Sequence, residues 1–591
     1  MFDRQCKNAV SVLLALTIVG APLSYSVRAQ SQSQSTTAPK LTDLFNELKK
    51  INAATTDPDE RMKLLIQMLE DRPELVRLEG GGGNIAYATN EYIKANLEHP
   101  QKLEQWYDVF VPLVQKTLEG ESRETSEFEY RLANFLQDKN ALPAQAAQLA
   151  QQAVQSFHED DVVARERGRR RPPQTNTPSG DEDTKAESLL RSDAEEHFHR
   201  DLAARYSLLA TLQMKTGQDT AALESFEHTL KLHPNMQAYV GEAALQEKQG
   251  DKQQALTLLF DAYLTGHMGA ADIEHMRGLY RELHPGSSDS QLDVLLDARY
   301  SATFNNPVKF SAYPQGTPAS SRKVLAEFFT GAACEPCISP DLAFAAALKR
   351  YTRDELVLLV YHDNAPAADP LANPVTDERR KYYATDGGTP HVFLDGKAFD
   401  IPQGLQSHAQ QSADRLFAGV DQALAGTTDA QVKVQAVRRG NSIEVTAHVR
   451  APAHGGRRKL HIDLIEKELS YSGENGLHFQ PMVVRATAQQ NDAGSGFRIP
   501  AGGSLDVRYV FDLPQIEAAN NAYYGHYAEE LKTRSNGMLN LVYREKKAVI
   551  DPTHLAVAAL VQDDGDKHVL QSAFSDVLER GGQHATDGRQ Q

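Results

Sequence analysis

The chain has 591 residues, a length that corresponds to about four domains of ordinary size. Hydrophobic residues make up 41% of it and charged residues 24%, so there is enough apolar material for several buried cores. A formal net charge of -17 gives an acidic surface that repels phosphate backbones, which argues against nucleic acid as a partner.

The N-terminus has the features of a secretory signal. Arg4 and Lys7 precede the apolar run 10–20, which is too short to span a bilayer comfortably, and Val27-Arg28-Ala29 offers a cleavage site. We expect residues 1–29 to be a signal peptide and residues 30–40 a disordered leader, with an uncleaved N-terminal anchor as the alternative. The remaining chain has no other long apolar stretch, so we expect an exported protein without an integral membrane segment, in the periplasm or cell envelope or secreted.

Residues 41–158 are rich in Leu, Ala, Gln, Glu and Lys at helical spacing and are expected to form a helical region. Four consecutive glycines, 80–83, interrupt it. No Gly-Lys-Ser/Thr follows them, so they indicate a flexible turn rather than a phosphate-binding loop. Residues 159–187 combine a basic run with two prolines and a polar, acidic stretch, which predicts a disordered linker.

A repeat lies within residues 188–300. The segment 212–217 is echoed by 245–250, and equivalent positions are 33 residues apart. This pattern resembles the helix pairs of the tetratricopeptide family, with a glycine in the turn and small alanines at the helix contacts. The resemblance implies an array of stacked helix pairs that either binds a peptide or protein partner in a concave groove or serves as a scaffold.

From residue 301 the pattern changes to alternating strands and helices. Strand-like runs at 324–329, 356–361 and 392–394 alternate with helical patterns at 338–351, 375–384 and 405–425, which predicts an α/β domain over residues 301–425. Alternating apolar and polar residues then predict an antiparallel β-sandwich over residues 426–580, followed by a flexible tail at 581–591. The predicted fold class is therefore multidomain, with a helical N-terminal half, an α/β domain and a C-terminal β-sandwich.

Cysteine usage points to redox chemistry. Of three cysteines, Cys6 lies in the expected signal, which leaves only Cys334 and Cys337. One Cys-x-x-Cys pair cannot complete a structural zinc site with four ligands, so a redox dithiol is favoured. The pair follows a buried strand and opens a helix, whose free N–H groups stabilise a thiolate at Cys334. Cys334 would attack a substrate disulfide, and Cys337 would resolve the mixed disulfide.

A second segment supports this interpretation. Gly388-Thr389-Pro390 precedes a short strand and the turn Asp395-Gly396, and this strongly resembles the cis-proline loop of thioredoxin-fold proteins. The resemblance implies that Pro390 is cis, that the loop packs beside the cysteines and that Thr389 contacts the substrate backbone. More narrowly, residues 322–397 resemble a thioredoxin-like family related to bacterial outer-membrane proteins, through the segments 327–331, 361–362, 369–370, 379–383 and 388–396.

Two further residues have two interpretations each. Thioredoxins keep a buried acid six residues before the first cysteine, and here Glu327 lies seven before it. Glu327 is either a proton acceptor for Cys337 or a hydrogen-bonded structural group. His362 follows a buried strand and either approaches the cysteines or is a structural histidine, and the second interpretation is favoured.

The leading hypothesis is thus an enzyme, a cell-envelope thiol–disulfide oxidoreductase that acts on protein disulfides and needs no cofactor or resident metal. The alternative is a non-catalytic envelope adaptor whose thioredoxin-like domain holds a structural disulfide between Cys334 and Cys337. A third reading is the handling of a soft ion such as Cu(I) by the dithiol, which no Met or His cluster supports.

Overall fold

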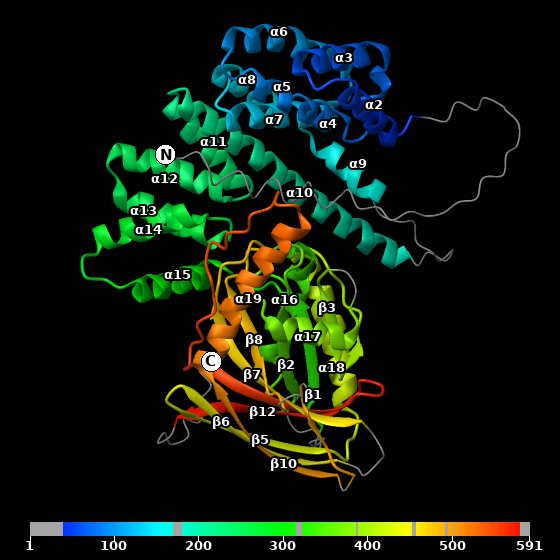
Figure 1. Cartoon of the computed structure of the whole chain (residues 1–591), viewed down its shortest axis with the longest axis vertical. Coiled ribbons are helices and arrows are strands. Elements are labelled where there is room, and N and C mark those ends of the chain that lie inside the picture. Colours follow the sequence, from blue (N-terminus) through cyan, green and yellow to red (C-terminus); the bar gives the residue numbers. More distant parts are fainter. Residues whose placement is uncertain are drawn as a thin grey trace, which may run out of the picture. The chain divides into compact units, whose positions relative to one another are not determined.

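The computed structural model describes residues 39–169, 180–314, 322–385, 388–451, 457–490, 495–501 and 503–579. The expected signal peptide, most of the leader and the C-terminal tail lie outside these residues. The described chain forms two compact units, residues 39–262 and 263–579, and each is described by itself (Figure 1). Within the described ranges, no helix is both long and apolar enough to cross a membrane.

The first unit is helical, as its composition indicates. Apolar residues recur every three to four positions, and this places them on one face of each helix, where they are buried. Its helices are α2 (Leu41–Ala54), α3 (Pro58–Asp71), α4 (Gly81–Ala88), α5 (Asn90–Ala95), α6 (Pro100–Thr117), α7 (Ser122–Asp138), α8 (Pro143–Gln155), α9 (Glu159–Arg169), α10 (Gly180–Lys215), α11 (Asp219–Leu232) and α12 (Met236–Gln249), with α13 (Lys252–Leu264) ending just past its boundary.

The four glycines at 80–83 are not a flexible turn, and that prediction is wrong. Gly81 begins helix α4, and a Cβ atom added at Gly82 would lie 2.1 Å from the backbone oxygen of Glu124 in α7. The buried Glu124 carboxylate accepts the N–H groups of Gly80 and Gly82, each at 3.0 Å. The glycines therefore let the start of α4 pack directly against α7.

Part of the expected linker 159–187 is also helical. Helix α9 occupies residues 159–169, and α10 begins at Gly180. Val162 of α9 is buried in a small cluster with Ala194 of α10 and Phe157. This apolar contact stabilises a segment whose high charge predicts disorder. Residues 170–179 lie outside the described ranges.

The repeated segments form two helix–turn–helix pairs, α10 with α11 and α12 with α13. Gly217 and Gly250 occupy the two turns at positive φ values of 78° and 91°, a conformation that favours glycine. A Cβ atom at Gly241 would lie 2.2 Å from the Phe226 ring, so α12 approaches α11 closely at this position. The 33-residue period of the sequence is thus a period of helix pairs.

The second unit begins with two helices, α14 (Ala270–Leu283) and α15 (Asp289–Thr303), and continues with a mixed sheet of twelve strands. The strand order is β10-β6-β5-β12-β11-β7-β8-β2-β1-β3-β4, and β9 pairs with β7. The strands are β1 (Val324–Thr330), β2 (Leu356–His362), β3 (His391–Leu394), β4 (Lys397–Ala398), β5 (Gln431–Arg439), β6 (Ser442–Arg450), β7 (Arg458–Ser470), β8 (Phe479–Thr487), β9 (Phe497–Arg498), β10 (Ser504–Asp512), β11 (Leu555–Asp563) and β12 (Val569–Glu579).

The α/β elements expected between residues 301 and 425 are confirmed. Strand β1 pairs with β2 in parallel and with β3 in antiparallel orientation. Helices α16 (Ile338–Arg350) and α18 (Ala409–Leu424) pack together, and Phe328 of β1 stacks on Phe344 of α16 at 4.7 Å. Helix α17 (Pro374–Tyr383) contacts Glu327, the neighbouring residue of β1. Because successive strand residues point to opposite faces, α17 covers the other face.

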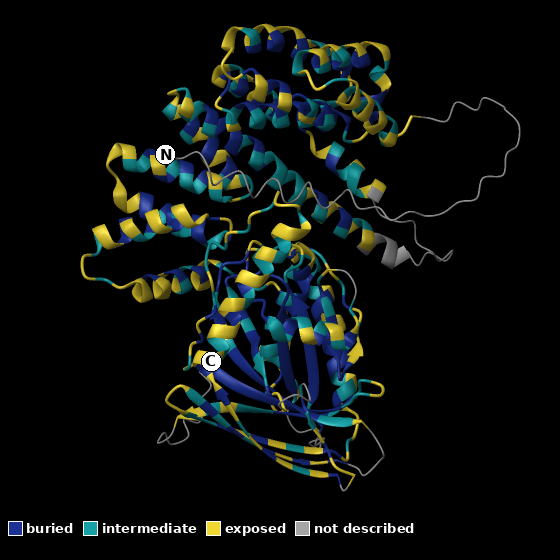
Figure 2. Cartoon of the chain, in the orientation of Figure 1, coloured by how far each residue is buried: buried dark blue, intermediate teal, exposed yellow. Residues whose placement is uncertain are grey.

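The separate β-sandwich is only partly correct, because these strands continue the same sheet. Strand β8 pairs in parallel with β2 through Val360 and Val483, so no boundary separates the two regions at residue 425. Along β11, Ala558 and Leu560 belong to the core around β1 and β2, while Val557, Ala559 and Val561 belong to a second core with β5 and β6. Figure 2 shows the central strands β1 and β2 as buried. A long helix, α19 (Leu513–Arg534), also lies in the region expected to be all β.

Candidate functional site

Cys334 and Cys337 form a disulfide bond between the end of β1 and the start of α16. Strand β1 ends at Thr330, and Glu335–Cys337 form a 3-10 turn that leads into α16. A Cβ atom at Gly331 would lie 2.7 Å from the backbone oxygen of Ala365, so glycine is needed where the chain leaves the strand. The predicted order of strand, cysteine pair and helix is confirmed. Both cysteines are buried, with exposed fractions of 1% and 0%.

Glu327 does not lie on the cysteine side of the sheet. Phe328 faces α16, the helix that begins directly after Cys337, so Glu327 points to the opposite face. Glu327 and Phe328 are neighbours in β1, and neighbouring side chains of a strand point to opposite faces of the sheet. The catalytic role expected for Glu327 is therefore not supported by its position.

Glu327 is instead the centre of a buried ion-pair network beneath α17. Arg379 donates to both carboxylate oxygens, at 2.6 and 3.0 Å, and Tyr383 and Tyr361 donate to them as well. Arg379 also donates to the Gln562 side chain of β11 at 2.9 Å. This pairing satisfies a buried charge and connects β1, α17 and β11, so the structural interpretation of Glu327 holds.

An acid that the sequence analysis missed lies on the cysteine face. Asp341 is four residues beyond Cys337 in α16, a spacing that places both on one side of the helix. Thr330 at the end of β1 donates its hydroxyl to Asp341 at 3.1 Å. The residue keeps some exposed surface, yet desolvation of its carboxyl group raises the pKa to about 7. The available signal was that Asp341 is the single charged residue in the stretch 338–348.

His362 and Asp369 form a buried pair beside Asp341. His362, at the end of β2, pairs in register with Thr330, and its Nδ1 lies 2.9 Å from the Asp369 carboxylate. Asp369 also accepts the backbone N–H of Ala332 at 2.7 Å, in the loop that leads to Cys334. Within the described parts of the chain, Nε2 of His362 is buried and has no hydrogen-bond partner. The pair thus connects the end of β2 to the cysteine loop.

The Thr389–Pro390 segment lies at the same edge of the sheet. The peptide bond between the two residues is cis, as the thioredoxin resemblance implied. Thr389 donates its hydroxyl to the backbone oxygen of Ala365 at 2.9 Å, and the same oxygen packs against Gly331. Residues 363–369 therefore connect the cysteine loop to the Thr389–Pro390 turn. The substrate contact expected for Thr389 stays a prediction.

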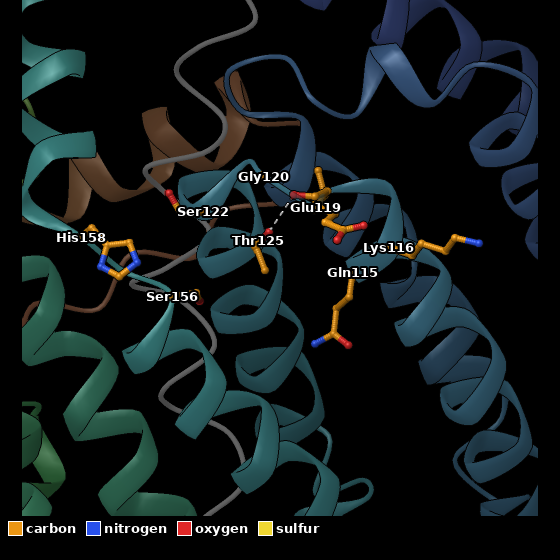
Figure 3. Close-up of a pocket in the computed structure, with 9 residues that line it drawn as sticks. Gln115, Lys116, Glu119, Gly120, Ser122, Thr125, Ser156 and His158 are labelled. Atoms are coloured by element: carbon orange, nitrogen blue, oxygen red, sulfur yellow. Dashed lines mark hydrogen bonds between the residues drawn. The ribbon is translucent and has the colours of Figure 1, made fainter.

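A shallow pocket in the helical unit does not form a comparable site. Its volume is about 440 Å³, and its lining residues come from the ends of α6 and α8 and the start of α7 (Figure 3). Ser122, Thr125 and Ser156 already bond to other protein groups. In the described residues, no group of three or more His, Cys, Asp or Glu side chains could hold a metal ion.

Comparisons with known proteins give little information. No protein-family model matches the sequence, and no curated protein matches it. Among solved structures, HBP35 of Porphyromonas gingivalis is similar over 46% of this chain and 82% of its own, with 13% sequence identity and a TM-score of 0.33.

Proposed function

We propose that this protein is a thiol–disulfide oxidoreductase that exchanges disulfides of other proteins through Cys334 and Cys337. The observation that carries the proposal is the placement of the disulfide. It lies at the start of α16, with Asp341, His362 and Asp369 clustered beside the strand ends that lead to it. Burial raises the pKa of the Asp341 carboxyl group in this cluster, and perturbed groups gather at functional sites.

The exchange has two steps, and the same residues serve both directions. In the reducing direction, the Cys334 thiolate attacks one sulfur of a substrate disulfide, and the other substrate sulfur leaves as a thiolate. Cys337 then loses its proton and attacks Cys334, which releases the second substrate sulfur. The substrate gains two electrons, the pair returns to the disulfide seen here, and a dithiol donor must reduce it again.

Asp341 takes the role of proton acceptor for Cys337 in this scheme. It follows Cys337 by one helical turn, and a carboxyl group with a pKa of about 7 can both accept and return a proton near neutral pH. His362, paired with Asp369, is a positioning residue at the end of β2.

The finer fold assignments belong to the same proposal. The β1–α16–β2 unit, followed by α17 and the β3–β4 hairpin, supports a thioredoxin-like domain. The helix pairs α10–α11 and α12–α13 support tetratricopeptide-like repeats that hold a peptide or protein partner. Export to the periplasm or cell envelope, or secretion, rests on residues 1–29, outside the described ranges.

One observation favours a second candidate. Both cysteines are almost completely buried, as expected for a structural disulfide in a non-catalytic envelope adaptor. In that case the cross-link would only fix the loop between β1 and α16.

The reduction potential of the pair decides between the two. The full chain is equilibrated in glutathione or dithiothreitol buffers, quenched with acid, and the free thiols are alkylated and counted by mass spectrometry. A reversible couple between about -120 and -270 mV supports the oxidoreductase. A potential below about -300 mV, with Cys334 unreactive in the reduced protein, overturns it in favour of the adaptor.

A further inference from the structure

A loop from the C-terminal part of the chain contacts the residues that precede Cys334. Residues 471–478, here named the capping loop, connect β7 to β8 and lie against the segment that precedes Cys334. The backbone N–H of Asn475 donates to the backbone oxygen of Ala332 at 2.9 Å. Leu477 belongs to the same buried cluster as both cysteines, and Tyr471 packs in a second small cluster with Ala332.

The loop approaches Ala332 closely. A Cβ atom added at Gly473 would lie 2.6 Å from the Ala332 oxygen and 3.2 Å from its Cβ. On its other side, the loop is pressed by Gly266, where an added Cβ would lie 1.9 Å from the Gly473 oxygen. This contact therefore requires glycine at position 473, because any side chain there would push the loop away from the cysteine segment.

Polar contacts hold the loop in this position. His478 lies between two partners, with Nε2 2.7 Å from the Asp297 carboxylate of α15 and Nδ1 2.7 Å from the Ser472 hydroxyl. Arg544 donates to the Tyr471 hydroxyl at 2.9 Å and to the backbone oxygen of Ser472. In the centre of the loop, Tyr300 of α15 donates its hydroxyl to the backbone oxygen of Gly476 at 3.4 Å. The centre contacts the cysteine segment through the Asn475 N–H and the close Gly473 packing.

The backbone of another polypeptide can replace the capping loop in this contact. The Asn475 N–H is a backbone group, and any extended polypeptide can offer the same donor to the Ala332 oxygen. No side chain of the capping loop donates to the cysteine segment in the hydrogen bonds among the described residues. A polypeptide that displaces the loop would therefore lose no specific side-chain contact at this point.

We propose that the capping loop is a displaceable cover of the disulfide. Building on the proposed oxidoreductase function, an extended segment of a substrate protein reaches Cys334 only after the loop leaves Ala332, and the substrate backbone then takes the place of Asn475. The cover keeps the pair from reacting with small thiols and disulfides, and an extended, unfolded segment is the partner that fits.

Loop-opening variants of the full chain test the cover. Gly473→Ala drives the loop off by steric contact, and Asp297→Ala removes the partner of His478 without touching the cysteine segment. The rate at which dithiothreitol reduces the disulfide is followed by acid quench and mass spectrometry. We expect the disulfide of both variants to be reduced faster than that of the wild type, by about tenfold or more. The reason is that opening of the capping loop no longer limits the rate of reduction.

The matched control is Gly278→Ala in α14, where an added Cβ meets nothing within 4 Å. It is expected to react at the wild-type rate. Circular dichroism and thermal unfolding identify any variant that fails to fold, and two independent variants keep the test decisive. Equal reduction rates for the wild type and both folded variants would overturn the cover.

A trapped complex tests the substrate part. Cys337→Ser leaves Cys334 to form a stable mixed disulfide with an unstructured peptide that carries a single cysteine. We expect the Asn475 amide to lose its protection from hydrogen exchange in the complex, relative to the oxidised wild type. A mixed disulfide that forms while this amide stays protected overturns displacement. These readouts are independent of the reduction potential, so failure of the cover and failure of the proposed function are distinguishable.

Discussion

The carboxyl group of Asp341 combines burial with a position one helical turn from Cys337. Thr330 gives it one hydrogen bond, and the nearby His362 favours its charged form, but desolvation outweighs both and raises its pKa to about 7. Glu327 is a contrasting case, since it receives both N–H groups of Arg379 and serves as a structural ion. The two acids thus have different surroundings, one largely desolvated and the other paired with an arginine.

Replacement of Asp341 by Asn changes how stability depends on pH. A folded-state pKa above the unfolded value of 3.8 means that the folded protein binds the extra proton between about pH 4 and pH 7. The wild type therefore loses stability as the pH rises through this window, and the variant does not. We expect the variant to gain, relative to the wild type, on the order of 2 kcal/mol between pH 5 and pH 8.

Urea unfolding of both proteins at the two pH values measures this difference. The rate of disulfide exchange is measured as well, because a change in stability alone would not alter its pH dependence. The pH profile of this rate should contain a step near pH 7 in the wild type that Asp341→Asn lacks. Parallel stability curves with identical pH profiles would show that Asp341 is not the titrating group.

The junction of α4 and α7 shows how an element depends on the absence of side chains. Gly82 has no room for a Cβ atom because the backbone of Glu124 lies against it, and the Glu124 carboxylate satisfies two N–H groups at the start of α4. A helix start with free N–H groups is costly when buried, and here a protein carboxylate supplies the acceptor.

Gly82→Ala is expected to destabilise the helical unit by about 1–3 kcal/mol or more, because backbone atoms must shift to admit the methyl group. Gly168→Ala in α9 is the matched control, since nothing lies within 4 Å of the added atom. Chemical unfolding followed by circular dichroism compares the two. A Gly82→Ala protein as stable as the control would mean that α4 and α7 are not in close contact.

For the whole molecule, the continuous sheet decides what can fold alone. Strand β2 has β8 as its neighbour, and the backbone of Lys323, just before β1, donates to Gln571 of β12 at 2.8 Å. Arg379 reaches Gln562 of β11 in the buried network. The α/β elements are thus completed by strands more than a hundred residues further along the chain.

A fragment of residues 301–425, the expected thioredoxin-like domain, should therefore not fold by itself. It would expose the β2 edge and leave Arg379 without one partner. A fragment of residues 263–579 retains every one of these contacts and should fold. Circular dichroism and the dispersion of amide NMR signals measure both. A cooperatively folded 301–425 fragment would contradict the view that the sheet is one unit.

Local patterns were sufficient for much of this protein. The strands and helices between residues 324 and 424 were predicted within one or two residues at most ends, because alternation and helical spacing are properties of neighbouring residues. The order of strand, cysteine pair and helix followed from the same information, as did the 33-residue helix pairs. Asp369 and His362 were noted, but the sequence could not place them against each other.

Long-range packing determined the remainder. Glu327 lies next to Arg379 because α17 packs on the face of the sheet to which Glu327 points. The raised pKa of Asp341 depends on the burial of its carboxyl group. Three contacts join residues far apart in the chain: β8 pairs with β2, Tyr524 of α19 donates to the backbone oxygen of Pro370, and the capping loop contacts Ala332. No periodicity encodes such contacts, because they arise when separate faces are desolvated together.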